Sequence, residues 1–228
     1  VYIGAIGLIT TYFFHGREHA RNLVQNCTNC GACKAVCAGG IELPKLIKEI
    51  HARIQDEEGH PLKSLLLGKV LKNRKLFHTL LRTAKLAQKP VTGGTPYLRH
   101  LPMIFSKEHN FRVLPAIAEI PFRDRFERLN QIHKNQAPKN PSHKSALFAG
   151  CVQDFVYPEQ LEAAMKSFAR ANVSVSFPMG QSCCGLPAQM MGEKEAARDV
   201  ALQNLAAFEA EEVDYIVTLC ASCGSHLK

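Results

Sequence analysis

The sequence contains no tryptophan and few other aromatic residues, and its absences exclude several classes of protein. Aromatic residues make up 7% of the 228 residues, and no nucleic-acid recognition motif is present. Because modules that bind nucleic acid combine such motifs with aromatic stacking platforms, the sequence argues against a nucleic-acid partner. A G-x-G-x-x-G fingerprint is also missing, since Gly93-Gly94 stands outside any such pattern. No dinucleotide or flavin site is therefore predicted.

Long apolar runs are missing as well. The apolar opening, residues 1–14, is too short to span a bilayer and is interrupted by Gly4 and Gly7. We therefore expect a cytoplasmic protein, either free or peripheral at the inner face of the membrane. The sequence begins at Val1 rather than at a methionine, and it stops at Lys228, just after a C-x2-C motif where a helix is expected to start. We interpret it as an internal segment of a longer protein, incomplete at both ends.

Acidic residues are absent from 59–107, and the net charge of the chain is +8. Basic residues accumulate in the same stretch: Lys63, Lys69, Lys72, Arg74, Lys75, Arg82, Lys85, Lys89, Arg99 and Lys107. A segment of one sign favours an acidic partner or an anionic membrane surface. We predict such docking for residues 63–89; the alternative is a solvated face whose charge is balanced elsewhere in the protein.

The nine cysteines, by contrast, are concentrated in two groups. The first has the spacing C-x2-C-x2-C-x3-C, which is typical of a ferredoxin-type [4Fe–4S] site, and Gly31 inside it lets the backbone turn tightly. Its members are Cys27, Cys30, Cys33 and Cys37. The second group contains Cys151, Cys183, Cys184, Cys220 and Cys223. An odd number of cysteines with C-x2-C repeats favours a metal or a cluster over disulfides.

Residues 1–55 form the first segment, a cluster-binding loop followed by a helix. The helix is predicted over 45–55, with Pro44 in its first turn. Its expected apolar face consists of Leu43, Leu46, Ile47, Ile50 and Ile54. His51 lies on the flank of this helix, and we expect it at the surface rather than as a ligand.

Residues 56–142 form the second segment, a basic and mainly helical middle section. The predicted elements are one or two helices over 62–88, a loop over 91–96, a short helix over 124–133 and a linker over 137–141. The expected apolar stripe of the first helical stretch consists of Leu66, Val70, Phe77, Leu80 and Leu81.

Residues 143–228 form the third segment, in which strands and helices alternate. Strands are predicted over 146–149, 173–177 and 215–219, and helices over 158–171 and 193–210. Strands separated by helices indicate a parallel sheet, so the fold class is mixed α/β with a Rossmann-like βα domain at the C-terminal end.

The second group of cysteines follows these predicted strands. Cys151 comes after the first strand, Cys183 and Cys184 lie in the loop after the second, and Cys220 follows the third directly. Open α/β sheets place their ligand sites at the carboxyl ends of the strands, where separate loops converge. We therefore predict that the five cysteines meet at one edge of the sheet; unrelated buried thiols are the alternative.

The spacing C-x31-C-C-G-x34-C-x2-C over residues 145–228 resembles the cysteine-rich CCG domain of heterodisulfide reductase subunits and their relatives. In that family the domain usually occurs twice, and in heterodisulfide reductase its five cysteines hold a non-cubane [4Fe–4S] cluster. The resemblance implies a second iron–sulfur cluster on Cys151, Cys183, Cys184, Cys220 and Cys223. It also implies a second copy of the domain beyond Lys228.

The beginning of the chain narrows the resemblance. The segments 2–7 and 27–33, together with 150–159 and 177–185, are similar to the iron–sulfur subunits of bacterial lactate-utilisation systems. The chain thus looks like part of a fusion of the ferredoxin-type subunit and the CCG subunit. Ala38 departs from the pattern, which usually has proline there; this concerns the geometry of the loop rather than its ligands.

The resemblance implies an electron-transfer component of a multi-subunit complex that oxidises L-lactate and passes electrons to a quinone or another carrier. A glycolate oxidase iron–sulfur subunit and a heterodisulfide reductase-type subunit are the alternatives within this class. A structural zinc module is the alternative from another class, although five thiolates exceed the four of a tetrahedral zinc site. His226, three residues after Cys223, is a candidate hydrogen-bond donor beside the second cluster.

Overall fold

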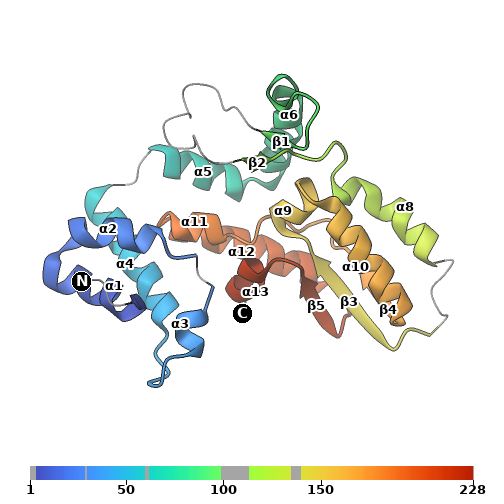
Figure 1. The fold of residues 1–228 in the computed structure, drawn as a ribbon. Coiled ribbons are helices and arrows are strands. Elements are labelled where there is room, and N and C mark those ends of the chain that lie inside the picture. The colour runs from blue at the N-terminus through green and yellow to red at the C-terminus, as the bar shows by residue number, and fades with distance from the viewer. Residues whose placement is uncertain (1–3, 29, 60–61, 99–112, 135–139, 228) are drawn as a thin grey trace. The chain divides into compact units, whose positions relative to one another are not determined.

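A computed structural model describes residues 4–28, 30–59, 62–98, 113–134 and 140–227 (Figure 1). The chain divides into two compact units that each combine distant parts of the sequence. The first unit consists of Val1–Asn73, Cys183–Leu205 and Cys220–Lys228, and the second of Arg74–Ser182 and Ala206–Leu219. The predicted division into residues 1–55, 56–142 and 143–228 stays a prediction, because each compact unit contains parts of more than one of these segments.

The first unit is helical. Its elements are α1 (Gly4–His15), α2 (Arg17–Gln25), α3 (Ala32–Ala35), α4 (Leu43–Glu58), α5 (Leu62–Lys72), α11 (Leu186–Met190), the first turns of α12 (Lys194–Glu209) and α13 (Ala221–Leu227). Helices α1 and α2 pack on α4. The core they enclose consists of Leu8, Ile9, Ala20, Val24, Leu43, Ile47, Ile50 and Ile54. Three cysteines of the first group, Cys27, Cys33 and Cys37, pack against this core, so α4 is the support of the cluster-binding loop.

The second unit contains the sheets. Its elements are α6 (Arg74–Thr92), β1 (Tyr97–Leu98), β2 (Leu114–Pro115), α8 (Phe122–Lys134), β3 (His143–Phe148), α9 (Gly150–Phe155), α10 (Pro158–Arg170), β4 (Val173–Ser176) and β5 (Tyr215–Thr218). Strands β1 and β2 form a small antiparallel pair, and the other three form a parallel sheet in the order β4-β3-β5. Ser145 of β3 is paired with Val175 of β4 and with Tyr215 of β5.

The central strand β3 is buried on both faces. Leu147 packs in a core with Leu161 and Phe177, whereas Phe148, which points to the opposite face, lies 5.9 Å from Phe208 between ring centroids. Successive side chains of a strand point to opposite faces, so four consecutive buried residues mark a strand covered on both sides. The predicted mixed α/β fold with a parallel sheet is confirmed.

The helix predicted over 45–55 is α4, which begins earlier and ends later, with Pro44 in its first turn as predicted. Two details of this helix were wrong. Leu46 is 42% exposed rather than part of the apolar face, and His51 is 4% exposed rather than at the surface. Helix α4 is covered on more than one side, because α1, α2 and α11 all pack on it.

The stretch predicted over 62–88 forms two helices, α5 and α6, with Asn73 between them. The apolar stripe is wrong at Leu66 and Leu80, which are 54% and 45% exposed. Helix α6 also continues through Pro90 to Thr92, into the region predicted as a loop. Arg99 and Lys107 of the basic stretch, and residues 137–139 of the linker, lie outside the described residues.

The remaining helices of the pattern are found close to their predicted bounds, as α8, α10 and α12. The sequence pattern missed α1 and α2 and the pair β1 and β2. None of the helices within the described residues is both long and apolar enough to cross a bilayer.

Candidate cluster-binding sites

The ferredoxin-type loop joins α2 to α4 in the first unit. Gly31 adopts φ +78° at the start of α3, a conformation that favours glycine, and this turn brings the backbone around Cys30. The backbone N–H of Ala32 and the hydroxyl of Thr28 donate hydrogen bonds to the sulfur of Cys30 and lower its pKa. Amide groups aimed at a thiolate are what an anionic cluster requires of its binding loop.

Cys33 lies near two other cysteines of this loop. The pKa of Cys33 is raised by burial and, next, by the charge of Cys27; Cys30 adds a smaller repulsion. Neighbouring thiols are compatible with the ligand set of one cubane. Cys37 follows α3 and packs against the core of the first unit.

Four thiols of the second group gather in the same unit. The sulfurs form a continuous set of S–H···S contacts from Cys183 to Cys184, from Cys184 to Cys223, and from Cys223 to Cys220. The hydrogen bond with Cys183 raises the pKa of Cys184 to about 12, and the one with Cys184 raises the pKa of Cys223. Metals and clusters bind cysteine as the thiolate, so binding at this site would displace the protons that these contacts hold.

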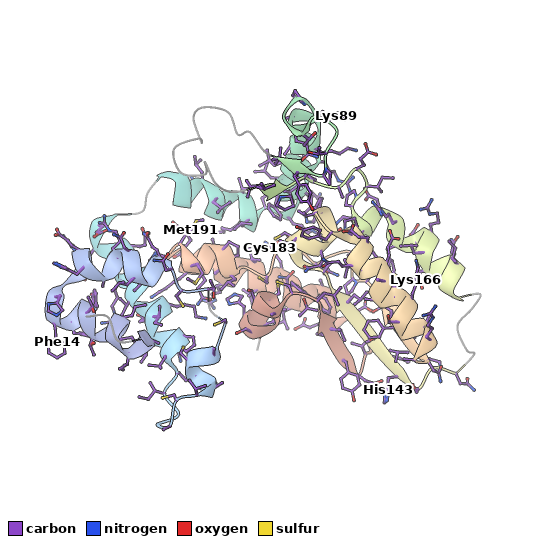
Figure 2. All side chains as sticks on the ribbon, viewed as in Figure 1. Phe14, Lys89, His143, Lys166, Cys183 and Met191 are labelled. Atoms are coloured by element: carbon purple, nitrogen blue, oxygen red, sulfur yellow. The ribbon has the colours of Figure 1, made fainter. Side chains whose placement is uncertain are left out.

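A close contact explains why glycine follows the two adjacent cysteines. Gly185 has φ +91° and begins α11, and a Cβ placed on it would lie 3.2 Å from the carbonyl oxygen of Ala197. The loop is also held to α12 by Asn204, whose buried amide donates a hydrogen bond of 2.7 Å to the carbonyl of Cys183. Gly185 and Asn204 thus fix the position of Cys184 and of Cys183, which Figure 2 labels.

Cys151 belongs to the second unit and lies in the first turn of α9, which begins two residues after β3. The loop after β4 is held by hydrogen bonds at the carboxyl end of β3, where α9 begins. The buried amide of Gln181 accepts a hydrogen bond of 2.7 Å from Ala149 N–H and donates one of 2.8 Å to the carbonyl of Leu147. Cys183 follows Gln181 by two residues. That Cys151 meets the other four cysteines of its group at one edge of the sheet stays a prediction.

A buried polar network surrounds this end of the sheet in the second unit, and the sequence pattern missed it. Arg123 of α8 is paired with Asp154 of α9, and its Nη1 donates to Nδ1 of His78, 3.2 Å away. Because Nδ1 accepts, His78 carries its proton on Nε2, which lies 3.5 Å from Oγ of Ser182. Burial, followed by the charge of Arg123, lowers the pKa of His78 to about 3, so the ring is neutral.

Both cysteine-bearing loops supply thiols together with backbone N–H groups near the sulfurs, which is the donor set that an iron–sulfur cluster requires. Within the described residues, no three Cys, His, Asp or Glu side chains are arranged to hold one metal ion. His226 is half-buried on α13, and its buried Nδ1 has no hydrogen-bond partner among the residues that the structure describes.

Comparison with known proteins agrees with this chemistry. Residues 145–228 match the family model of the cysteine-rich CCG domain. The chain is 27% identical to a probable glycolate oxidase iron–sulfur subunit of Bacillus subtilis, over 92% of the chain and 48% of the relative. It is 28% identical to an uncharacterized iron–sulfur protein of Methanococcus maripaludis, over 90% of the chain and 33% of the relative.

A lactate utilization protein A of Bacillus cereus is 40% identical over 36% of the chain and 33% of its own length. The chain thus spans about a third to a half of the length of these relatives, and no solved structure matches it significantly. The predicted resemblance to CCG, lactate-utilisation and glycolate oxidase iron–sulfur proteins is confirmed. The relatives and the clustered cysteines together support iron–sulfur cluster binding by this chain.

Proposed function

We propose that the chain is the electron-transfer part of a complex that oxidises a small 2-hydroxy acid, with L-lactate as the preferred substrate and a quinone or another carrier as the acceptor. One cluster is held by cysteines of the group Cys27, Cys30, Cys33 and Cys37. The other is held by Cys151, Cys183, Cys184, Cys220 and Cys223. The partners are the other subunits or domains of the complex, and the location is the cytoplasm or the inner face of the membrane.

The close approach of the two cysteine-bearing loops in the first unit carries this proposal. A Cβ placed on Gly31, between Cys30 and Cys33, would lie 3.7 Å from Oγ of Ser225, two residues after Cys223. Clusters held by loops in van der Waals contact can exchange electrons directly.

The test begins with the full-length protein purified without oxygen. Iron and sulfide analysis and electron paramagnetic resonance are expected to reveal both clusters, and Cys223→Ser is expected to remove the signal of the second cluster alone. Zinc without sulfide at both sites would contradict the proposal. Reduction of the clusters by the assembled complex is then measured with L-lactate and with glycolate.

Glycolate oxidation is the second candidate, because the glycolate oxidase relative covers nearly the whole chain whereas the lactate utilization relative covers about a third of it. Faster cluster reduction by glycolate would favour this candidate. A heterodisulfide reductase-type reaction stays the third alternative, and reduction of a disulfide by the pre-reduced protein would reveal it.

Docking through residues 63–89 is proposed for the exposed part of the basic stretch only. Several of its members have partners inside their own unit: Lys72 is 2.6 Å from Asp199 in the first, and Arg82 is 2.6 Å from Asp124 in the second. Lys69, Lys75 and Lys89 are exposed. Because exposed charges are screened within roughly 10 Å at 0.1 M salt, binding to acidic vesicles or to the partner subunits is expected to weaken sharply as salt is raised. Binding that ignores salt would indicate a solvated face.

A further inference from the structure

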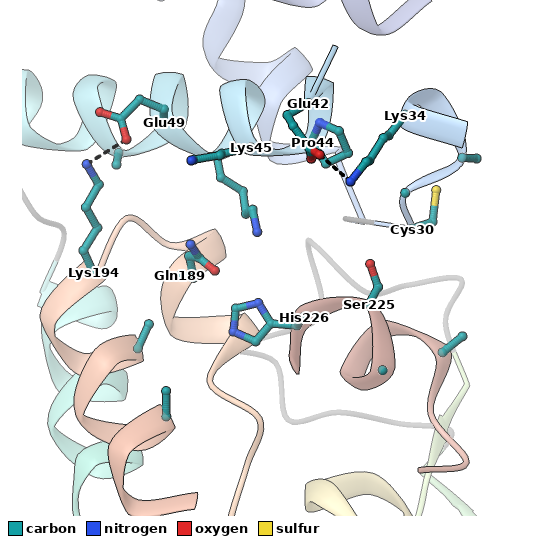
Figure 3. A pocket seen from close by; sticks show the side chains of 18 of the residues that line it. Cys30, Lys34, Glu42, Pro44, Lys45, Glu49, Gln189, Lys194, Ser225 and His226 are labelled. Carbon is teal, nitrogen blue, oxygen red and sulfur yellow. Dashed lines mark hydrogen bonds and ion pairs between the residues drawn. The ribbon is translucent and has the colours of Figure 1, made fainter. Parts of the chain in front are cut away.

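A cleft of about 1370 Å³ lies wholly within the first unit, beside both cysteine-bearing loops (Figure 3). Its walls are the ferredoxin-type loop, helix α4, helices α11 and α12, and helix α13, which begins directly after Cys220. Electron transfer between the two loops needs no open space of this size. The shape and the lining of the cleft therefore need an explanation of their own.

The ferredoxin-type loop is most accessible at this cleft. Cys30 lines the cleft and is exposed, whereas Cys27 and Cys33 are half-buried. Figure 3 shows Cys30 across from Ser225 of α13. Lys48 of α4 is another lining residue, and burial lowers its pKa while the nearby thiolate of Cys27 partly offsets this effect. A molecule in the cleft thus lies beside the cysteines of the ferredoxin-type motif.

The lining carries an excess of positive charge, with five basic and two acidic side chains. Both acidic residues form ion pairs with lysines of the lining (Figure 3): Glu42 with Lys34, and Glu49 with Lys194. The other basic residues form no ion pair with a carboxylate of the described residues: Lys45, Lys48 and Arg198. Cations that line a concave surface attract anions, so the electrostatics favour a negatively charged occupant.

The remaining lining argues against a small apolar or aromatic ligand. Among the described residues that border the cleft there is no Leu, Ile, Val, Met, Phe or Tyr. Small residues form much of the wall instead: Ala32, Ala35, Ala197, Ala201, Ala221 and Gly224. Pockets for cofactors and other small molecules are lined mainly by hydrophobic and aromatic side chains, and nucleic-acid bases are usually stacked on aromatic rings. A wide, polar and basic cleft suits the acidic surface of another protein.

We propose that this cleft is the docking site for an acidic redox protein that takes electrons from the ferredoxin-type cluster. The inference rests on the proposed electron-transfer function and selects a protein carrier over a quinone, for which the cleft offers no apolar wall. Acidic side chains of the carrier lie against Lys45, Lys48 and Arg198, and its redox centre approaches the loop at Cys30. In each encounter the reduced cluster loses one electron and the carrier gains it, with no bond formed or broken.

An electrostatic site of this kind fits the small interfaces of transient redox encounters, in which complementary charge sets the rate of association. It is distinct from the basic stretch, because none of the lining residues belongs to 63–89. The two surfaces can therefore be tested by separate substitutions.

The test uses the full-length, cluster-loaded protein, reduced with dithionite and freed of excess reductant without oxygen. Oxidation of the clusters is followed by stopped-flow absorption with three one-electron acceptors: an acidic b-type cytochrome, the basic protein cytochrome c, and ferricyanide as a small anion. Each rate is compared between the unaltered protein and its variants, so differences in potential between the acceptors cancel.

Lys45→Glu/Arg198→Glu reverses two exposed charges of the cleft. At low salt it is expected to slow oxidation by the acidic cytochrome at least about tenfold, because electrostatic steering accounts for factors of this size, and not to slow oxidation by cytochrome c. Lys45→Gln/Arg198→Gln, which removes the charges without reversing them, is expected to slow the acidic cytochrome about threefold. Both effects should shrink at high salt, where exposed charges are screened.

Lys166→Glu/Arg170→Glu is the matched control, since it makes the same change in net charge at two exposed positions of α10 in the second unit (Figure 2). Its expected effect on the acidic cytochrome is less than about twofold. Equal slowing in the control and the cleft variant would indicate general attraction to a basic protein and overturn the proposal. Slowing of ferricyanide without slowing of the acidic cytochrome would also overturn it, in favour of a small anion.

Cluster content, measured as iron and sulfide in every sample, tests the electron-transfer function separately. A protein without clusters would contradict both that function and the docking site. Fully loaded clusters, with an unaltered rate toward the acidic cytochrome in Lys45→Glu/Arg198→Glu, would overturn the docking site alone.

Discussion

The guanidinium of Arg123 and the carboxylate of Asp154 form a buried ion pair in which Nε lies 2.6 Å from Oδ2. The backbone N–H of Arg123 donates to Oδ1 of the same carboxylate at 3.0 Å. The pair fixes α8 against α9, the helix that bears Cys151. Arg123 also stands over the ring of Phe155, 5.4 Å from its centroid. The middle section of the chain thus supports the loops of the CCG domain.

Removing one partner of this pair should be costly. Arg123→Met leaves a buried carboxylate without its cation, and a loss of about 3–5 kcal/mol in the free energy of unfolding is expected. The matched control is Arg82→Met, which breaks the exposed pair with Asp124, also two-pronged at 2.6 and 2.7 Å. Because exposed pairs contribute little, its expected loss is under about 1 kcal/mol. Urea unfolding under anaerobic conditions measures both, and equal losses would contradict the assigned role.

The second prediction concerns Gly185. Gly185→Ala combines an unfavourable positive φ with a Cβ pressed against the carbonyl of Ala197, so we expect a loss of about 2–3 kcal/mol and a smaller content of the second cluster. Gly59→Ala is the control: its φ is +82°, but no atom of the described residues lies within 4 Å of the added Cβ. It should lose about 1–3 kcal/mol from backbone strain alone and keep both clusters. Equal cluster content in the two variants would show that the glycine is not needed for the site.

These two predictions rest on contacts that the sequence pattern only partly reveals. The cysteine spacings, the alternation of Val173–Ser176 and the apolar face of α10 are local signals, and each predicted its element. Gly185 is part of the sequence motif, but the need for glycine there comes from the backbone of Ala197 in a later helix, which leaves no room for a Cβ. A local pattern identifies such a residue without explaining it.

The buried ion pair and the buried histidines could not be predicted in this way. Arg123 lies in a segment rich in charged residues, a pattern typical of an exposed helix. Its partner Asp154 comes 31 residues later. His51 lies on α4, on which α1, α2 and α11 all pack, and α11 comes more than a hundred residues further on. Periodicity describes one face of a helix, and packing by distant segments is decided only in the folded chain.

The third prediction concerns pH and His78. Its pKa is about 3 in the folded protein against an ordinary value of 6.5, so between these values the unfolded chain binds a proton that the folded chain excludes. Stability from this group is therefore complete above pH 6.5 and is lost as pH falls toward 3. His78→Gln, which cannot titrate, should show a shallower decline of unfolding free energy between pH 6.5 and 4.5. His19→Gln, at an exposed position, is the control, and an unchanged slope in His78→Gln would refute the assignment.

The last prediction concerns the fourth cysteine of the ferredoxin-type motif. In two-cluster ferredoxins the fourth cysteine of each run ligates the cluster of the other run. Cys27 and Cys30, both near Cys33, should then hold one cubane together with Cys33, and its fourth ligand should come from outside these 228 residues. Cys37 should reach a second cubane, whose other three ligands also lie outside them.

Single substitutions in the full-length protein distinguish this exchange of ligands from an arrangement in which all four cysteines hold one cluster. Cys37→Ser is expected to change the electron paramagnetic resonance signal of the cubane outside these residues and to leave the signal of the Cys27 cluster intact. Cys30→Ser is the matched variant and should have the opposite effect, because Cys30 sits among the sulfurs of its own loop. Loss of the same signal in both variants would mean that all four cysteines hold one cluster, and the exchange of ligands between two runs would then be wrong for this protein.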